Sequence, residues 1–220
     1  MQVTYEEIKN SAEIRTYITQ ADASLLAIGY TEHSFAHVGR CAQVAGDLLR
    51  DLDYDAHTVE LCRIAAYMHD IGNVVNRNDH AQTGAVMAFR ILDKMGMEPP
   101  DVAAVITAIG HHDDSTAFPV NAIAAALLLA DKTDVRRSRV RNRDTINFDI
   151  HDRVNYAVEH SGLSLDRASK TITLALSINT EVCAVMDYFE IFLGRMLLCR
   201  KAAEFFSLTF HLDVNGQNLL

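Results

Sequence analysis

The chain has 220 residues, of which 49% are hydrophobic and 22% are charged, and its formal net charge is −9 at pH 7. This length allows one substantial core with a small appended unit, and the composition is that of a soluble globular protein. The negative charge argues against an extended nucleic-acid surface, and the longest apolar run, Ala122 to Ala130, is too short to span a bilayer.

The first ten residues, MQVTYEEIKN, contain no basic segment followed by an apolar core, so the sequence predicts no signal peptide. The four cysteines lie within apolar helical patterns without CxxC spacing, and they are Cys41, Cys62, Cys183 and Cys199. Such a pattern favours buried, reduced thiols. We therefore expect a cytoplasmic protein without disulfides.

Capping signals open the first three predicted helices. Residues 4–7, TYEE, form a capping-box pattern that begins the first helix. A second amphipathic stretch runs from about residue 33 to residue 52. Asp55 can cap a third helix, which ends near His69 and Asp70. The third predicted helix thus ends in two side chains that protein interiors rarely accept without partners.

Three more helices are predicted before residue 135. Residues 79–82, DHAQ, repeat a capping-box pattern, and Gly96 is a natural stop for the fourth helix. Pro99 and Pro100 suit the start of a fifth helix that reaches His111 and His112. Pro119 opens a sixth helix that includes Asp131.

Beyond residue 135 the sequence becomes polar and charge-rich before its pattern changes. Residues 152–160 indicate a short helix and residues 170–178 alternate as a strand does. Residues 180–204 have helical periodicity, and residues 205–216 alternate again. The sequence therefore predicts a mainly α protein: a helical domain over residues 1–145 and a small α/β subdomain, strand–helix–strand, over residues 146–220.

Histidines and aspartates recur at the ends of these helices. His33 and His37 are four residues apart, so they are expected on one helix face. Five successive predicted helices each carry a residue that can bind a metal: His37, His69, Asp70, His80, His111, His112 and Asp131. Neighbouring helices of a bundle can bring such ends to one pocket. Imidazoles and carboxylates without a thiolate suit Fe, Mn, Co, Ni or Zn, and they disfavour magnesium alone.

The chemistry of such a pocket follows from its central carboxylate. One carboxylate can bridge two ions, and Asp70 is the natural candidate for this role. Two bridged ions could hold a hydroxide between them and clamp a phosphate, because they lower the pKa of bound water. Any one of these histidines taken alone is better explained as a structural residue. The hypothesis therefore depends on their order along the chain and on their occurrence together with the aspartates.

Three segments resemble the HD superfamily of metal-dependent phosphohydrolases. His37, His69-Asp70 and Asp131 resemble its H…HD…D pattern. Residues 37–42, HVGRCA, are similar to H-x-x-R-V-A, and residues 66–72, AYMHDIG, to A-x-L-H-D-I-G. The resemblance covers roughly residues 30–135 and implies an HD-type helical bundle.

His80, followed by Gly84, and the pair His111-His112 resemble the additional ligands of HD proteins that bind two metals. By this resemblance two ions are expected. His37, His69, Asp70 and Asp131 would hold one ion, and Asp70, His80, His111 and His112 would hold the other. If only one of the adjacent histidines binds, His112 is favoured. No GYP triplet follows it, so a cyclic dinucleotide substrate is not transferred.

Further roles follow for several residues. Asp70 and His69 are the predicted catalytic centre, and His33 is a candidate leaving-group acid, although a supporting or substrate contact fits it equally. Phosphate contacts are expected from Lys132, Arg136 and Arg77. The basic stretch after Asp131 has an alternative interpretation, a solvated connection that pairs with nearby acidic residues, namely Asp144, Asp149 and Asp152.

The resulting hypothesis is a metal-dependent phosphohydrolase acting on a nucleotide or another small phosphoester. One alternative is a diiron oxygenase, because the same ligands can bind an iron pair. Another is a non-catalytic module that senses a ligand. Residues 188–197, YFEIFLGRML, are apolar enough to face a partner, which leaves a homodimer open, or to pack on their own strands.

Overall fold

The computed structural model describes residues 3–141 and 150–219. Contacts divide the chain into two compact units, Met1–Asp131 and Lys132–Leu220, and each is described by itself. The predicted domain boundary at residues 145/146 lies outside the described residues and stays a prediction, as do the pairings proposed for Asp144 and Asp149. A mainly α fold with a small α/β part is confirmed.

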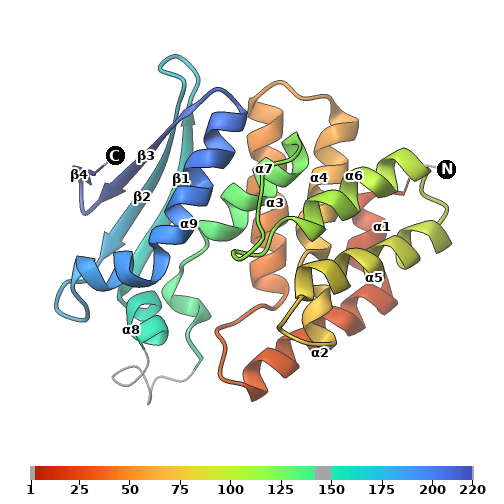
Figure 1. Ribbon diagram of the computed structural model, residues 1–220, viewed down its shortest axis with the longest axis horizontal. Helices are drawn as coiled ribbons and strands as arrows, with labels where there is room; N and C mark the ends of the chain where they lie inside the picture. The colour runs from red at the N-terminus through yellow and green to blue at the C-terminus, as the bar shows by residue number, and fades with distance from the viewer. Residues whose placement is uncertain (1–2, 142–149, 220) are drawn as a thin grey trace. The chain divides into compact units, whose positions relative to one another are not determined.

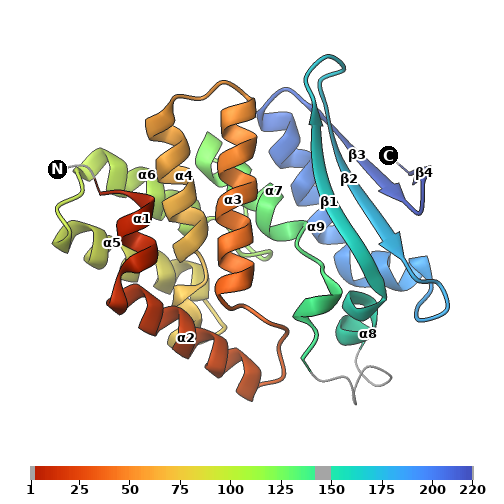
Figure 2. The ribbon, with the colours of Figure 1, turned by 180° about the vertical axis from the view of Figure 1, so that it is seen from behind.

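The first unit is built from helices (Figure 1). Their bounds are α1 (Tyr5–Asn10), α2 (Ala12–Ala27), α3 (Phe35–Asp51), α4 (Ala56–Met68), the 3-10 helix η1 (Ile71–Val74), α5 (His80–Lys94), α6 (Pro99–Gly110) and α7 (Ala122–Lys132). The helices α3 and α4 lie side by side, joined by a short connection (Figure 2). Between them they bury Cys41, Leu49, Cys62 and Ile64.

The predicted capping box at Thr4 forms, and it opens α1. The first predicted helix is nevertheless two helices, because the Ser11 hydroxyl accepts a hydrogen bond from the Ile14 N–H and caps α2. Asp55 caps α4 as predicted, accepting from the Thr58 N–H at 2.9 Å.

Ser34 sets the start of α3, because its hydroxyl accepts from the Ala36 N–H at 3.2 Å. His33 therefore precedes the helix, and the expectation that His33 and His37 share a helix face is wrong. The two rings still meet edge to face, with their centroids 5.5 Å apart.

The later helix starts are partly as predicted. Asp79 precedes α5 in a left-handed conformation (φ 57°) without a side-chain cap, so the capping box predicted there is wrong. Pro99 begins α6, and Gly96 (φ 79°) follows α5, both as predicted. The helix α7 begins at Ala122 rather than Pro119, because Asn121 Oδ1 accepts from the Ala124 N–H at 2.8 Å.

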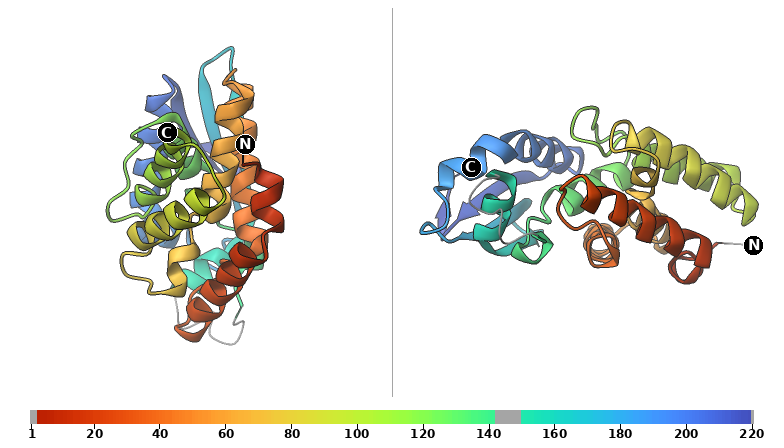
Figure 3. Two further views of the ribbon diagram at one scale, coloured as in Figure 1. Left: turned by 90° about the vertical axis from the view of Figure 1, so that its right-hand side faces the viewer. Right: turned by 90° about the horizontal axis from the view of Figure 1, so that it is seen from below.

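The second unit contains a four-stranded sheet in the order β1-β2-β3-β4. Its elements are the 3-10 helix η2 (Arg137–Arg139), α8 (Ile150–Ala157), β1 (Val158–Asp166), β2 (Thr171–Ile178), α9 (Val185–Phe205), β3 (Thr209–Val214) and β4 (Gln217–Asn218). The strands β2 and β3 are parallel and are joined through α9, which covers one face of the sheet (Figure 3). This confirms the predicted strand–helix–strand unit.

The sequence did not predict β1 or β4. Both pair antiparallel with their neighbours, β1 with β2 and β4 with β3. Residues 158–160, expected at the end of a helix, begin β1 instead. All four cysteines are free and buried, as expected. None of the helices in the described residues combines the length and apolar character needed to cross a bilayer.

Candidate metal centre

Helix ends bring the site together within the first unit. His37 lies in the first turn of α3, and His69 and Asp70 follow the last turn of α4. His80 begins α5, and His112 lies two residues beyond the end of α6. Asp131 is close to the end of α7. These six side chains converge in space, and those of His37, His69, His80 and His112 are almost completely buried.

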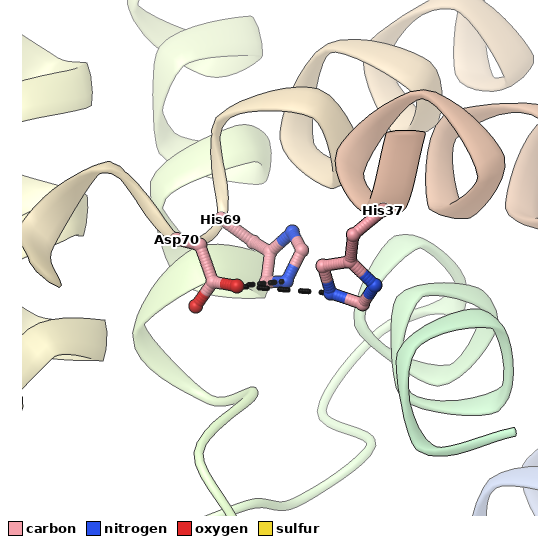
Figure 4. A group of neighbouring side chains, drawn as sticks. All are labelled: His37, His69 and Asp70. Carbon is pink, nitrogen blue, oxygen red and sulfur yellow. Dashed lines mark ion pairs between the residues drawn. The ribbon is translucent and has the colours of Figure 1, made fainter. Parts of the chain in front are cut away.

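One oxygen of Asp70 faces the first group of ligands (Figure 4). Its Oδ2 lies 3.2 Å from His69 Nε2 and 3.7 Å from His37 Nε2. Asp131 Oδ1 completes this group, at 3.3 Å from His37 Nε2 and 3.8 Å from His69 Nε2. Ligand atoms that share one ion through bonds of about 2.1 Å lie roughly 3.0–3.4 Å apart. The separations of 3.2 and 3.3 Å match this range, and those of 3.7 and 3.8 Å are slightly wider.

The other oxygen of Asp70 faces a second group. Its Oδ1 lies 3.6 Å from His80 Nε2 and 3.7 Å from His112 Nε2. The two imidazole nitrogens are themselves 3.1 Å apart. Asp70 therefore stands between two clusters of nitrogen and oxygen atoms and offers one oxygen to each.

Backbone carbonyls fix the orientation of three of these rings. The Nδ1 atoms of His69, His80 and His112 lie 2.8, 2.9 and 2.6 Å from the carbonyl oxygens of Ala66, Arg77 and Ile109, respectively. A carbonyl can only accept, so each Nδ1 carries a proton and donates it. In the neutral ring the Nε2 lone pair then points at Asp70, which is the arrangement of a metal-ligating histidine.

His69 Nε2 is a buried atom without a hydrogen-bond partner in the part of the chain that the structure describes. Leaving such an atom unsatisfied is costly. His80 and His112 present a related problem. Both rings donate through Nδ1, so in their neutral forms the two Nε2 atoms, 3.1 Å apart, face each other with lone pairs that repel. A cation beside each group of nitrogens removes both difficulties, so the donor set fits metal ions.

The electrostatics of the site favour positive charge. Burial opposes a charged His69, but the carboxylates of Asp70 and Asp131 outweigh it and raise the pKa of that imidazole. Burial would raise the pKa of Asp70, but His69 and His112 hold it well below its usual range. Burial lowers the pKa of His80 to about 4. The negative field that favours a proton on His69 favours a metal cation equally.

Two further residues that support the site were not predicted. Asn73 is buried, and its amide donates to the backbone oxygen and to Oδ1 of Asp70, at 3.0 and 2.9 Å. Gly72 lets η1 approach α5, because a Cβ there would lie 2.0 Å from the His80 carbonyl oxygen. The HDIG stretch gave a signal for the glycine, whereas nothing in the sequence pattern distinguished the asparagine.

The remaining histidines predicted for the site are placed differently. His111 caps α6 and belongs to none of the metal-type groups found among the described residues, whereas His112 does. His33 Nδ1 lies 2.7 Å from the Thr31 carbonyl oxygen, and its ring lies beside His37. Cys41, expected only as a core thiol, forms a possible ligand group with His37 and Asp131.

The basic residues predicted to contact phosphate lie in both units. Arg77 is in the first unit, with Nη1 3.2 Å from His80 Nε2. Lys132 and Arg136 belong to the second unit, where Lys132 is buried. The Arg136 guanidinium binds both oxygens of Asp134. Arg136 thus already holds a carboxylate of its own unit.

Comparison with known proteins shows which family the chain resembles. The family model described as HD domain matches residues 34–190, which is more than half of the chain. Ribonuclease Y of Cutibacterium acnes (strain DSM 16379 / KPA171202) is 31% identical over 128 residues, which cover 53% of this chain and 22% of that protein. The chain thus spans about a fifth of the length of this curated relative.

Proposed function

The chain belongs to the HD domain family of metal-dependent phosphohydrolases, and on that premise we propose that it hydrolyses a phosphoester of a nucleotide or another small phosphorylated molecule, using two metal ions. The observation that carries the proposal is that the two carboxylate oxygens of Asp70 face two different groups of histidines. Its Oδ2 faces His37 and His69, and its Oδ1 faces His80 and His112. A carboxylate so placed can bridge two ions.

Hydrogen bonds within the chain orient the side chains of this site independently of substrate. Bound ions would supply Lewis acidity, which activates water and stabilises charge on a phosphoryl group. Asn73 donates to Oδ1 and to the backbone oxygen of Asp70, and so fixes the orientation in which that carboxylate would meet both ions. The carbonyls of Ala66, Arg77 and Ile109 keep three imidazoles in the orientation that ligation needs. Burial of these groups strengthens every electrostatic interaction with them.

The ligand set supports Fe, Mn, Co, Ni or Zn. The proposed ligands are His37, His69 and Asp131 for one ion and His80 and His112 for the other, with Asp70 shared. Imidazole nitrogens outnumber carboxylates in this set, which favours transition metals over magnesium. His111 is kept only as a weaker candidate, because it lies outside these groups.

A small substrate is favoured by the charge of the chain. The net charge of −9 argues against a long polyanion, although the named relative is a ribonuclease. RNA oligonucleotides therefore belong in the assay as competitors of the small phosphoesters. Arg77 is the favoured phosphate contact, since Arg136 is bound to Asp134. Lys132 and Arg136 stay in the proposal as weaker candidates.

His33 is proposed as the leaving-group acid because it stands beside His37 at the edge of the site. A His33→Ala variant should then lose turnover mainly on substrates with poor leaving groups, which need protonation most. Equal losses on good and poor leaving groups would assign His33 a supporting role instead.

The test couples metal content to activity. Purified protein is analysed for bound metals, stripped, reloaded with Mn, Fe, Co, Ni or Zn, and assayed on phosphomonoesters, nucleotides and phosphodiesters. We expect about two ions per chain and hydrolysis that Asp70→Asn abolishes. His57→Ala is the matched control, since His57 is exposed and bonds Asp101. Oxygen consumption by the iron-loaded protein, with no hydrolysis, would favour the oxygenase instead.

A further inference from the structure

Arg77 is a cation next to the metal centre with no carboxylate partner among the described residues. Its Nη1 donates to Asn73 Oδ1 at 3.3 Å and lies 3.2 Å from His80 Nε2. Its guanidinium carbon lies 5.3 Å from the centroid of the Tyr30 ring, in a cation–π contact. The arginine is thus held in place by neutral groups, and its positive charge is left without an anion.

His80 meets Arg77 through both ring nitrogens. Its Nδ1–H donates to the Arg77 carbonyl, which leaves Nε2 as an acceptor with a single lone pair. The guanidinium N–H uses that lone pair. An ion held by Asp70, His80 and His112 would need the same lone pair. The arginine and the ion therefore exclude each other at His80.

We propose that Arg77 couples metal binding to the binding of a substrate oxyanion. In the structure its N–H meets the Nε2 lone pair of His80. When an ion takes His80, that N–H is released while Asn73 and Tyr30 still hold the side chain at the site. The freed donor then binds a phosphoryl oxygen, as arginine forks do. This inference rests on the proposed function, because it names the residue that recognises the phosphate.

The coupling between metal binding and anion binding must be positive and equal in both directions. Without an anion, Arg77 weakens metal binding, since it competes for a lone pair and adds a positive charge near the ion. A bound oxyanion neutralises that charge and engages the released N–H. The anion must therefore tighten metal binding by the same factor as the metal tightens anion binding.

Calorimetric titrations test this directly. Mn²⁺ is titrated into the stripped chain with and without methylphosphonate, a phosphoester analogue that cannot be hydrolysed, and the analogue is titrated into the Mn²⁺-loaded chain. In Arg77→Ala, the second Mn²⁺ should bind about tenfold more tightly without the analogue, and the analogue about tenfold more weakly to the loaded chain, within the usual range of such couplings. The analogue should then tighten Mn²⁺ binding about tenfold less than it does in the wild type.

Arg90→Ala is the matched control, because it removes the same charge from an exposed position on α5 and should change neither affinity. Arg77→Gln repeats the test with a polar side chain if truncation to alanine lowers the melting temperature. The inference is overturned if Arg77 variants titrate like Arg90→Ala while the wild type hydrolyses phosphoesters. If the affinities shift as expected but no phosphoester is hydrolysed, the inference stands and the proposed function fails.

A second, independent observation concerns the outer face of α9. Met186, Leu193 and Leu197 are 73%, 51% and 42% exposed, and their spacing places them along one line of the helix. Two charged residues lie on the same line. Glu190 lies between Met186 and Leu193, and Arg200 follows Leu197, 3.8 Å from Glu204.

This charge order matches an antiparallel second copy of the same helix. With a two-fold axis between Leu193 and Leu197, each leucine meets the other leucine of the partner copy, and Glu190 meets Arg200. A parallel arrangement would oppose like charges instead. We infer that α9 forms a homodimer contact in this antiparallel register, as a two-fold interface requires of a self-complementary surface.

Sedimentation across a dilution series tests the contact. We expect a dimer for the wild type, a monomer for Leu193→Glu, and weakened association for Glu190→Arg. The double variant Glu190→Arg with Arg200→Glu should restore the dimer, because the charges are exchanged rather than lost. Leu26→Glu, on exposed α2, is the control and should remain dimeric. A monomeric wild type, or a dimer that Leu193→Glu leaves intact, would overturn the inference.

Discussion

His111 and His112 are adjacent in the chain, yet they differ in what they can do. His112 Nε2 lies 3.7 Å from Asp70 Oδ1, whereas His111 lies in none of the described metal-type groups. We therefore expect His112→Ala to reduce bound metal from about two ions to about one, and His111→Ala to retain both. Metal analysis by atomic emission after dialysis measures this.

The adjacent pair is its own control, because both variants remove the same imidazole from the same turn. Melting curves exclude unfolding as the cause of metal loss. Equal metal content in the two variants would contradict the placement of His112 as a ligand.

Asn73 is expected to position Asp70 rather than to touch substrate. In Asn73→Ala the carboxylate of Asp70 loses its hydrogen bond at Oδ1, the backbone oxygen of Asp70 loses another, and the carboxylate can turn away from the second group of nitrogens. Loss of such a support typically costs about 10–100-fold in metal affinity or activity. Competition with a colorimetric chelator measures the affinity.

Asn78→Ala serves as the comparison for Asn73→Ala. Asn78 is exposed, and among the described residues its one hydrogen bond is from its backbone N–H to Asn76 Oδ1. The substitution at residue 78 should leave metal affinity within twofold of the wild type. If both variants bind metal equally well, Asn73 does not position the bridge.

At the residue scale, the sequence could predict which metal-type side chains come together but not the residues that support them. His69-Asp70 and Asp131 could be predicted because a metal-binding pattern is defined by residue type and by order along the chain, and both can be read from the sequence. The supporting hydrogen bonds join residues three apart in the chain: Asn73 donates to Asp70, and His69 donates to the Ala66 carbonyl. Many sequences of similar polarity could form such bonds, so the pattern did not distinguish them. The choice between the adjacent histidines depended on the turn that ends α6, which spacing alone left open.

Among the elements, η1 is packed so closely on α5 that only glycine fits at residue 72. A Cβ on Gly72 would lie 2.0 Å from the His80 carbonyl oxygen and 2.5 Å from the Gly84 N–H nitrogen. Gly72→Ala should therefore lower the free energy of unfolding by about 1–3 kcal/mol, as overpacking does, and displace His80 from Asp70. Denaturant titration with metal analysis measures both effects.

Gly39→Ala is the contrasting substitution. Gly39 lies in α3, and a Cβ there would meet nothing within 4 Å. It should stabilise the protein by about 0.5–1 kcal/mol, because alanine has the higher helix propensity. A similar loss of stability in both variants would mean that close packing does not explain the glycine at residue 72.

The start of α4 should carry a pH dependence. Hydrogen bonds from the N–H and hydroxyl of Thr58 lower the pKa of Asp55. The unfolded chain takes up that proton at higher pH than the folded chain, so the stabilisation is full above about pH 4 and is lost as pH falls through the lower folded pKa. Asp55→Ala should therefore lower the denaturation midpoint at pH 7 and much less at pH 2.5.

Asp55→Asn tests the same cap without a titrating group. Asparagine caps helices about as well as aspartate, so the variant should match the wild type at pH 7 and gain relative stability in acid. A constant difference between Asp55→Ala and the wild type at all pH values would contradict the role of the carboxylate.

Helix starts were predicted correctly where a residue typical of a helix amino terminus stands in the local sequence. Thr4, Asp55 and Pro99 mark starts that the structure confirms. Ser11 and Ser34 are equally good caps, but neither was distinguished from its polar neighbours. The strand β1 was not predicted, because an irregular register between Val158 and His160 interrupts the alternation at its start.

For the whole molecule, metal removal should act on one unit. All six proposed ligands lie within Met1–Asp131. Ions at a hundredfold excess over their dissociation constant would stabilise this unit by about 2.7 kcal/mol per site. A chelator should therefore speed hydrogen exchange in α3 and α4 while leaving the amides of β2 and β3 unchanged. Mass spectrometry of exchanged peptides measures this.

The readout separates metal loss from general destabilisation. Added Mn²⁺ should restore slow exchange in the helices, and His112→Ala should show only part of the chelator effect. Faster exchange of the sheet amides on chelation, to the same extent as the helices, would show that the metals stabilise more than the unit that binds them.

At this scale the sequence predicted the fold class but not the complete sheet. Helical periodicity and a change of pattern after residue 135 were sufficient for a helical bundle followed by an α/β part. The pairing of β4 with β3 involves two residues, which is too short for any period to be detected. The strand β1 pairs with the next strand, β2, in a hairpin joined by residues 167–170, but its sequence VEHSGLSLD lacks the regular alternation by which β2 was predicted.

The ligands gathered at the helix ends come from positions between residue 37 and residue 131. No partial chain can assemble this set, because Asp131 follows all five other ligands. Acquisition of the proposed ions would therefore follow translation past residue 131. Once bound, they would act as non-covalent cross-links that close long loops, and the entropy of those loops would oppose reopening of the chain.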